Sequence, residues 1–171
     1  VVPGSPALDE LRAAFGDAIV AKDGTLDRAA LASLVFGSDE RLRTLNAITH
    51  KRIWARAAAR IGELSAEGEP LAVWEAALLI ESGSADMFRP LLVVACSQDV
   101  QLERLMKRDG SSMVDALSRI SAQMTSADKV KSADFVIEND ADIETVGQRT
   151  DEVLGLVCDQ LGILRSRFGL H

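Results

Sequence analysis

LLVVACSQDVQLERLMKRDGSSMVDALSRISAQM, residues 91–124, is the stretch that decides the fold. It opens with a short apolar run, LLVVA, which lies between Pro90 and Ser97. Such a run is too short and too apolar for a surface helix, and it is typical of a strand that is buried on both faces. The sequence therefore predicts an α/β protein with a parallel sheet and flanking helices.

From Gln98 onward the apolar residues recur at helical spacing, and Gln101, Arg104 and Arg108 form a separate polar stripe. Asp109 and Gly110 are typical of a helix end, and Ser112 with an acidic residue three positions later is typical of a capped helix start. The second helix carries Arg119 on its polar face. The pattern predicts a helical hairpin that presents Arg104, Arg108 and Arg119 near one another.

An arginine cluster of this kind is suited to binding phosphates. Each guanidinium group can donate two parallel hydrogen bonds to phosphoryl oxygens and keeps its charge at any physiological pH. Arginines on helix faces are also common as solvated surface charges. The spacing alone leaves both interpretations open.

The rest of the chain shows helical and strand patterns around this hairpin. Two more strands are predicted over residues 71–80 and 134–138, the first of them buried. Helices are predicted over about residues 6–16, 26–36, 39–65 and 142–161, with a further helical turn after Ser126.

Composition limits the classes of function. The chain has 171 residues, of which 47% are hydrophobic, and this is enough for one α/β domain with a core. Its formal net charge of −7 argues against a general surface for nucleic acid or for an anionic membrane. We find no membrane span or signal peptide pattern, and we expect a cytoplasmic protein. Two cysteines and two histidines show no metal-binding spacing, so no metal ligands are predicted.

Several segments together resemble one enzyme family. QLERLMKRDG, SRISAQM and KSADFVIEND are similar to the lid and the following strand of dephospho-coenzyme A kinases, the last enzymes of coenzyme A biosynthesis. VVPGSPAL, DGTLDRAALASLVF, LNAITHKRI and EAALLIESG agree with the family in order and spacing. The resemblance covers about the first 145 residues, and several separate motifs in the right order are stronger than any one of them.

The resemblance implies a three-layer architecture like that of P-loop kinases, in a single truncated kinase domain. A helical acceptor-binding region would span about residues 5–68, the core residues 71–96 and 133–162, and the lid region residues 98–131. The implied reaction transfers the γ-phosphoryl group of ATP, as its Mg²⁺ complex, to the ribose 3′-hydroxyl of dephospho-coenzyme A. No nucleic acid or membrane partner is implied, and the oligomeric state cannot be inferred.

The resemblance also suggests roles for individual residues. Arg108 and Arg119, followed by Arg104, would close over the phosphates as the catalytic lid arginines. Glu75 and Glu81 border the family's cleft and would orient substrate or hydrated Mg²⁺. The acceptor-side and nucleotide-side candidates are His50 and Arg52, in the segment beside the acceptor pocket, and Asn139, in the turn that contributes to the base pocket. The family usually has Pro where this chain has Lys51.

One family motif is not found in these 171 residues. The phosphate-binding loop of the type Gly-x-x-x-x-Gly-Lys-Ser/Thr is missing, and no Gly-Lys pair occurs anywhere. The loop cradles the polyphosphate with backbone amides and a lysine, and it follows a strand that is normally central in the sheet. We therefore expect that an amino-terminal part, including the first central strand, is absent, and that the 171 residues alone have little or no kinase activity.

Two alternatives remain open at this stage. The chain could be another small-molecule kinase of the same architecture, which would also use lid arginines. It could instead be a non-catalytic remnant that binds coenzyme A or a protein. Activity on dephospho-coenzyme A, compared with activity on other acceptors, would distinguish a dephospho-coenzyme A kinase from the first alternative. A phosphate-binding loop encoded immediately upstream of Val1 would argue against the second.

Overall fold

The apolar run after Pro90 forms a strand, as predicted. In the computed structural model, which describes residues 3–170, β1 (Leu92–Ala95) pairs in parallel with β2 (Phe135–Glu138). The register places Leu92 opposite Phe135 and Ala95 opposite Glu138. Within the described residues this strand pair is the whole sheet.

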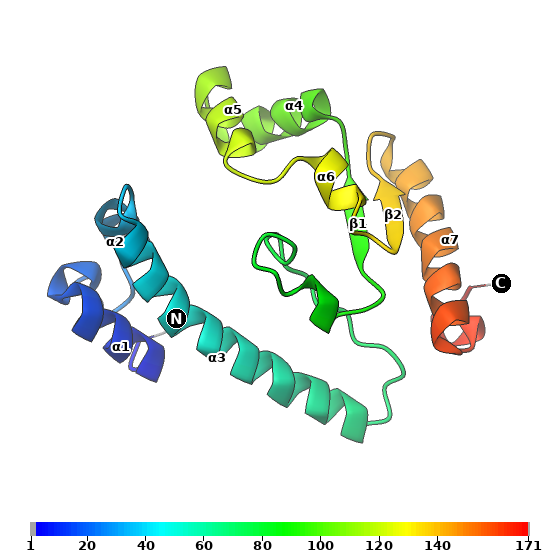
Figure 1. The fold of residues 1–171 in the computed structure, drawn as a ribbon, viewed down its shortest axis with the longest axis horizontal. Coiled ribbons are helices and arrows are strands. Elements are labelled where there is room, and N and C mark those ends of the chain that lie inside the picture. The colour runs from blue at the N-terminus through cyan, green and yellow to red at the C-terminus, as the bar shows by residue number, and fades with distance from the viewer. Residues whose placement is uncertain (1–2, 171) are drawn as a thin grey trace. The chain divides into compact units, whose positions relative to one another are not determined.

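The chain divides into two compact units, Val1–Ala72 and Val73–His171. The sheet belongs to the second unit, where a long helix packs along β2 and a short helix contacts β1 (Figure 1). The helices of this unit are α4 (Gln98–Asp109), α5 (Met113–Ser121), α6 (Ser126–Val130) and α7 (Ile143–Leu161). The prediction of an α/β fold with a parallel sheet and flanking helices is confirmed.

The first unit is helical, as the apolar periodicity indicates. Its core is formed by Leu11, Ile19 and Leu31, which are all nearly or fully buried. The helices are α1 (Pro6–Phe15), α2 (Arg28–Val35) and α3 (Asp39–Ala66), with a 3₁₀ turn at Asp17–Ile19. Helix α3 continues through Lys51 without interruption, since lysine has the backbone N–H that proline lacks.

The strand predicted over residues 71–80 does not form. Residues 71–76 have no regular secondary structure, and residues 77–83 form successive turns. The backbone N–H groups of Ser82 and Gly83 donate locally, to the carbonyl oxygens of Leu78 and Ile80. A strand needs a neighbour to pair its backbone groups, and no described strand lies beside this segment. The apolar composition of residues 71–80 favours a strand, but it does not show whether a neighbouring strand is present.

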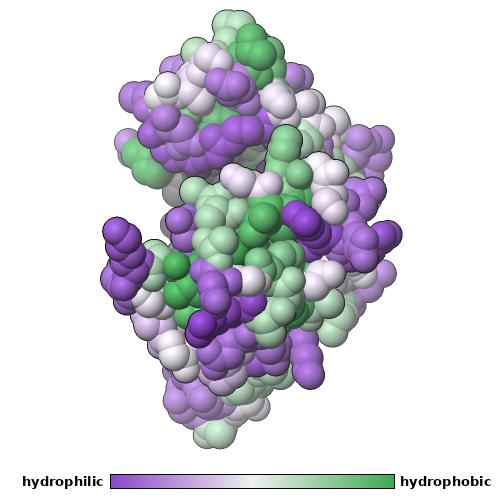
Figure 2. Space-filling view, turned by 90° about the vertical axis from the view of Figure 1, so that its left-hand side faces the viewer, coloured by the Kyte–Doolittle hydropathy of each residue, from purple (hydrophilic) through white to green (hydrophobic). Residues whose placement is uncertain are grey.

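The prediction that β1 is buried on both faces is also wrong. Val93 is 7% exposed, whereas Leu92 and Val94 are 38% and 57% exposed. Successive side chains of a strand point to opposite faces, and only the face that carries Val93 and Ile137 is covered. On the side of the molecule drawn in Figure 2, hydrophobic side chains likewise reach the surface between hydrophilic ones.

An aspartate closes each end of the strand pair. At the amino end, Asp134 Oδ2 accepts from the backbone N–H of Leu91 at 2.5 Å and from Arg89 Nη1 at 2.9 Å. At the carboxyl end, Asp140 Oδ1 accepts from the backbone N–H and the hydroxyl of Ser97, at 2.8 and 3.0 Å. In both cases the backbone hydrogen bond is the main cause of a lowered pKa of the aspartate, so both carboxylates remain ionised at neutral pH.

The segment after α7 turns back onto that helix as a 3₁₀ turn, Arg165–Phe168. The Arg165 guanidinium group pairs with Asp159 through two hydrogen bonds. It also covers Gly155, where an added Cβ atom would lie 3.0 Å from Arg165 Nη1. Glycine at position 155 therefore makes room for the arginine.

Candidate functional site

The carboxyl ends of β1 and β2 define the candidate site. Open α/β sheets bind ligands at the carboxyl ends of their parallel strands. Here the backbone N–H of Asn139 donates to the carbonyl oxygen of Ala95 at 2.7 Å, which continues the pairing past the last strand residues. The hairpin of α4 and α5, which is predicted from the sequence to be the lid, starts from this end of β1 (Figure 1).

Helix α4 is fixed at its start by its N-cap residue and by one side chain of its polar stripe. Its N-cap is Ser97, whose hydroxyl accepts from the backbone N–H of Val100 at 3.4 Å. Gln101 Nε2 donates to the carbonyl oxygen of Cys96 at 3.1 Å and to Ser126 Oγ at 2.8 Å. One amide group therefore ties the start of α4 both to the strand end and to the start of α6.

Arg104, one turn further along α4, contacts the loop after β2. Its Nη1 atom donates to the carbonyl oxygen of Asn139 at 2.8 Å. The structure thus brings together two residues that the sequence placed in different parts of the site, the lid and the base pocket. The guanidinium group lies at the carboxyl end of the sheet.

Arg108 and Arg119 meet at one carboxylate. Arg108 Nε and Nη2 donate to Asp109 Oδ1 and Oδ2 at 2.7 and 3.1 Å. Arg119 Nη1, from α5, donates to Asp109 Oδ2 at 2.7 Å. The hydrogen bonds from Arg108 and then Arg119 lower the pKa of Asp109 to about 2. Two of the three predicted lid arginines are therefore brought together, whereas Arg104 binds Asn139 instead.

The corner between the two helices explains this convergence. Helix α4 ends at Asp109 because Gly110 adopts the left-handed conformation, with φ of 63°, that favours glycine. Helix α5 begins as predicted, with the Ser112 hydroxyl accepting from the backbone N–H of Asp115 at 3.2 Å. Ala116 is fully buried and lies one turn before Arg119 on α5.

Glu81 lies in the turns that replace the predicted strand. Its Oε1 atom accepts from Lys129 Nζ at 2.9 Å and from the backbone N–H of Met124 at 3.3 Å. Lys129 Nζ also donates to the carbonyl oxygen of Ala77 at 3.1 Å. Burial raises the pKa of Glu81, but the hydrogen bond from Lys129 and the backbone donors outweigh it, so the pKa lies below its usual value.

The remaining predicted residues are Glu75 in the second unit and His50 and Arg52 in the first. Glu75 is exposed, so the prediction that it lies inside a buried strand is wrong. His50 and Arg52 belong to α3 in the first unit, where His50 is exposed. Arg52 Nη2 pairs with Glu10 Oε1 at 2.7 Å. This pairing is the main cause of a lowered pKa of Glu10.

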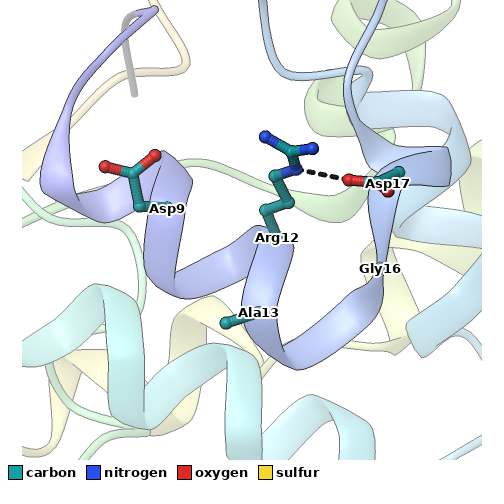
Figure 3. A pocket seen from close by; sticks show the side chains of 5 residues that line it. All are labelled: Asp9, Arg12, Ala13, Gly16 and Asp17. Carbon is teal, nitrogen blue, oxygen red and sulfur yellow. Dashed lines mark hydrogen bonds and ion pairs between the residues drawn. The ribbon is translucent and has the colours of Figure 1, made fainter.

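A surface pocket of about 400 Å³ lies on the first unit, at the end of α1. Figure 3 shows Arg12 pointing toward Asp17, with which it forms an ion pair, while Asp9 lies one turn earlier. Both partners of the pair are more than half exposed. None of the residues predicted for the site lines this pocket.

Residues 3–170 contain no group of three or more His, Cys, Asp or Glu side chains arranged to hold a metal ion. Within the same residues, every helix is too short or too polar to cross a membrane.

Comparison with known proteins identifies the family. The profile of the family described as dephospho-CoA kinase matches residues 1–145. The dephospho-CoA kinase of Geobacter sulfurreducens is 39% identical over 153 residues, which are 90% of this chain and 78% of the relative. The chain belongs to the dephospho-CoA kinase family. The dephospho-CoA kinase of Corynebacterium glutamicum is 35% identical over 161 residues, 94% of this chain and 80% of the relative.

Solved structures agree with this membership. The Thermus thermophilus protein TT1252 superimposes with a TM-score of 0.72 at 36% identity, covering 86% of this chain and 74% of that protein. The dephospho-CoA kinase from Campylobacter jejuni gives a TM-score of 0.62 at 26% identity, covering 91% and 77%. As a member of the dephospho-CoA kinase family, the chain is a kinase of coenzyme A biosynthesis, and this confirms the predicted enzyme class.

The contacts of three residues in the candidate site were not predicted from the sequence. Asp109 was interpreted only as a helix end, although an acidic residue beside Arg108 is a signal for an ion pair. Gln101 was placed on the correct stripe without a partner. Lys129 gave no usable signal, because its partner Glu81 is distant in sequence and only the fold brings them together.

Proposed function

We propose that this chain acts in the transfer of the γ-phosphoryl group of ATP to the ribose 3′-hydroxyl of dephospho-coenzyme A, in the cytoplasm, and that Arg108 and Arg119 bind the transferring phosphates. One observation carries the assignment of roles. The two guanidinium groups come from different helices and converge on one carboxylate, in a hairpin that starts at the carboxyl end of β1.

The chemistry explains why such a pair is useful. Phosphoryl transfer depends mainly on positioning and on stabilising the charge of the equatorial oxygens. Guanidinium groups remain charged and donate in a fixed, planar fork. The contacts with Asp109 leave most N–H donors of the two groups available to other acceptors. The pair can therefore bind phosphoryl oxygens without losing its own counter-ion.

Arg104 and Asn139 would serve the nucleotide end of the site. Arg104 holds the Asn139 carbonyl oxygen, which positions the loop after β2. We propose that the Asn139 side chain contributes to the base pocket and that Arg104 contacts phosphate when the lid closes. The contact between these residues supports a common nucleotide-binding end of the sheet.

The acceptor side is assigned to the remaining residues. We propose that His50 and Arg52, two positions apart on α3, contact dephospho-coenzyme A, whose phosphate groups suit a cationic partner. Glu75 and Glu81 would orient substrate or hydrated Mg²⁺. The ion enters as the complex with ATP, where it neutralises charge on the phosphate oxygens.

Replacing Arg108 by Ala tests the assignment. The measurement is steady-state kinetics on the protein expressed from its complete gene, with Lys107→Ala as the control because Lys107 is the neighbouring cation on α4. We expect Arg108→Ala to lower kcat/KM by about 10²-fold, the loss typical of one preorganised donor, with an unchanged unfolding midpoint. An unchanged rate would remove Arg108 from the site, and an equal loss in Lys107→Ala would indicate a nonspecific effect of charge.

A further inference from the structure

Asp109 lies between Arg108 and Arg119, and the proposed roles of these arginines do not explain why a carboxylate is present there. It is the last residue of α4, and its carboxylate accepts from Arg108 of the same helix and from Arg119 of the next helix. Its side chain is 26% exposed, whereas those of Arg108 and Arg119 are 70% and 56% exposed. The carboxylate is thus the less exposed, central member of a three-residue cluster.

The electrostatics of the cluster require such a group. Two guanidinium groups that approach one site repel each other, and side chains this exposed would otherwise separate into solvent. A carboxylate between them adds two attractions that offset this repulsion. Since the pKa of Asp109 is about 2, the carboxylate stays charged throughout the physiological pH range.

The hydrogen-bond geometry leaves the arginines able to bind a further anion. Arg108 uses its Nε and Nη2 atoms, so its Nη1 group has no partner in the described residues. Arg119 uses only Nη1, and its Nε and Nη2 groups are likewise without a partner there. Asp109 therefore orients both groups while leaving N–H donors on each.

The backbone fixes Asp109 itself. The N–H of Gly110 donates to the carbonyl oxygen of Met106 at 2.9 Å, and the left-handed Gly110 directs the chain into the start of α5. The carboxylate consequently lies at the corner of the hairpin, where both helices come together. The location of the carboxylate is therefore determined by the fold of the hairpin.

We propose that Asp109 is a positioning residue: it holds Arg108 and Arg119 side by side, so that the phosphates of ATP meet a preformed pair of guanidinium groups. The inference rests on the proposed phosphate-binding role of the two arginines. Asp109 does not contact substrate in this scheme. It acts through the arginines, and its removal leaves them present but disordered.

The test uses Asp109→Asn, which keeps the size of the side chain and removes its charge, in the protein expressed from its complete gene. Glu103→Gln is the control, because it makes the same charge change on an exposed part of α4. We expect Asp109→Asn to lower kcat/KM for ATP by roughly 10- to 100-fold, the cost of a misplaced catalytic group. Asp109→Glu should restore part of the loss, and Glu103→Gln should behave like the wild type.

A double-mutant comparison separates positioning from a general effect on the lid. In an Arg119→Ala background, Asp109→Asn should cost much less than it does alone, since one of the groups it orients is already gone. Full additivity would overturn the proposal. So would a lower KM for ATP in Asp109→Asn, which would indicate that the carboxylate competes with phosphate.

Parallel measurements on Arg108→Ala and Arg119→Ala test the proposed role of the arginines separately from the proposed role of Asp109. If both lose activity while Asp109→Asn does not, the arginine roles stand and the inference about Asp109 is wrong. If neither arginine variant loses activity, both are wrong. The NMR signals of the Arg108 and Arg119 Nε–H groups give a readout that is independent of turnover, and we expect them to broaden in Asp109→Asn.

Discussion

Replacing Lys129 by Met is expected to destabilise the second unit measurably. Lys129 and Glu81 form an ion pair at 2.9 Å whose side chains are only 18% and 22% exposed. Methionine keeps the apolar stem of the lysine but removes the donor to Glu81 and to the Ala77 carbonyl oxygen. Hydrogen bonds to charged groups contribute about 1.5–3 kcal/mol each. With partial solvent screening we expect a loss of about 1–3 kcal/mol in the free energy of unfolding.

Tryptophan fluorescence during urea unfolding can measure this loss of stability for the second unit separately. The chain has two tryptophans, so a Trp54→Phe background leaves Trp74, which stacks on Phe88 in the second unit with ring centroids 6.1 Å apart. With a urea slope of about 2 kcal/mol/M, the midpoint should fall by about 0.5–1.5 M. The slope itself should not change, because the same surface is exposed on unfolding.

Lys131→Met is the matched control, because Lys131 is the C-cap residue of the same helix. Lys131 pairs with Asp128 at 2.6 Å, but the two side chains are 74% and 49% exposed, and exposed pairs contribute little. Its midpoint should stay at the wild-type value. Equal shifts in the two variants, or no shift in Lys129→Met, would refute the argument that partial burial gives this pair its importance.

The pH dependence gives a second check on the same pair. The pKa of folded Glu81 is lowered, so its contribution to stability is fully present above the unfolded pKa of about 4.3. It is lost as the pH falls through the lower folded value. The stability difference between wild type and Lys129→Met should therefore be constant near neutral pH and shrink below about pH 4. A difference that grew on acidification would contradict the assignment.

Two further predictions concern other parts of the second unit. Gly155→Leu should displace the Arg165 guanidinium group, since even a Cβ atom there would lie 3.0 Å from it. Hydrogen exchange after α7 should then speed up, whereas Gly147→Leu, on the same helix but with nothing within 4 Å, should leave it unchanged. The Asp109 carboxyl group should titrate near pH 2 by NMR, so its ion pairs persist above about pH 4 and weaken only toward pH 2. A midpoint near 4 would show that the arginines do not hold it.

Local sequence patterns predicted most of the helices and both strands of the sheet. Caps such as Ser112, helix-ending residues such as Gly110 and the apolar period of α7 each act within a few residues, so the sequence shows them directly. The same holds for the run that forms β1, although its second face is exposed. Segment 71–80 failed because strand formation depends on a neighbouring strand, which composition does not indicate.

The candidate site was predicted only in part, for a related reason. Spacing placed Arg104, Arg108 and Arg119 on polar helix faces, but it could not show what each guanidinium group contacts. Arg104 meets Asn139, 35 positions later, and Arg119 meets Asp109 across a helix corner. Partners this distant in sequence are determined by the packing of the hairpin against the sheet end, which the chain adopts only after its elements have formed.

The two aspartates that close the strand pair help to fix the register of β1 against β2. A pair of four-residue strands has few backbone hydrogen bonds with which to resist sliding, and a slip by one position would turn every side chain to the other face. Asp134 and Asp140 each accept a hydrogen bond from a backbone N–H that flanks β1, that of Leu91 and that of Ser97 respectively, so any slip breaks both hydrogen bonds at once. Arg104, which donates to the carbonyl oxygen of Asn139 next to Asp140, is therefore aligned by the same hydrogen bonds that hold the strand register.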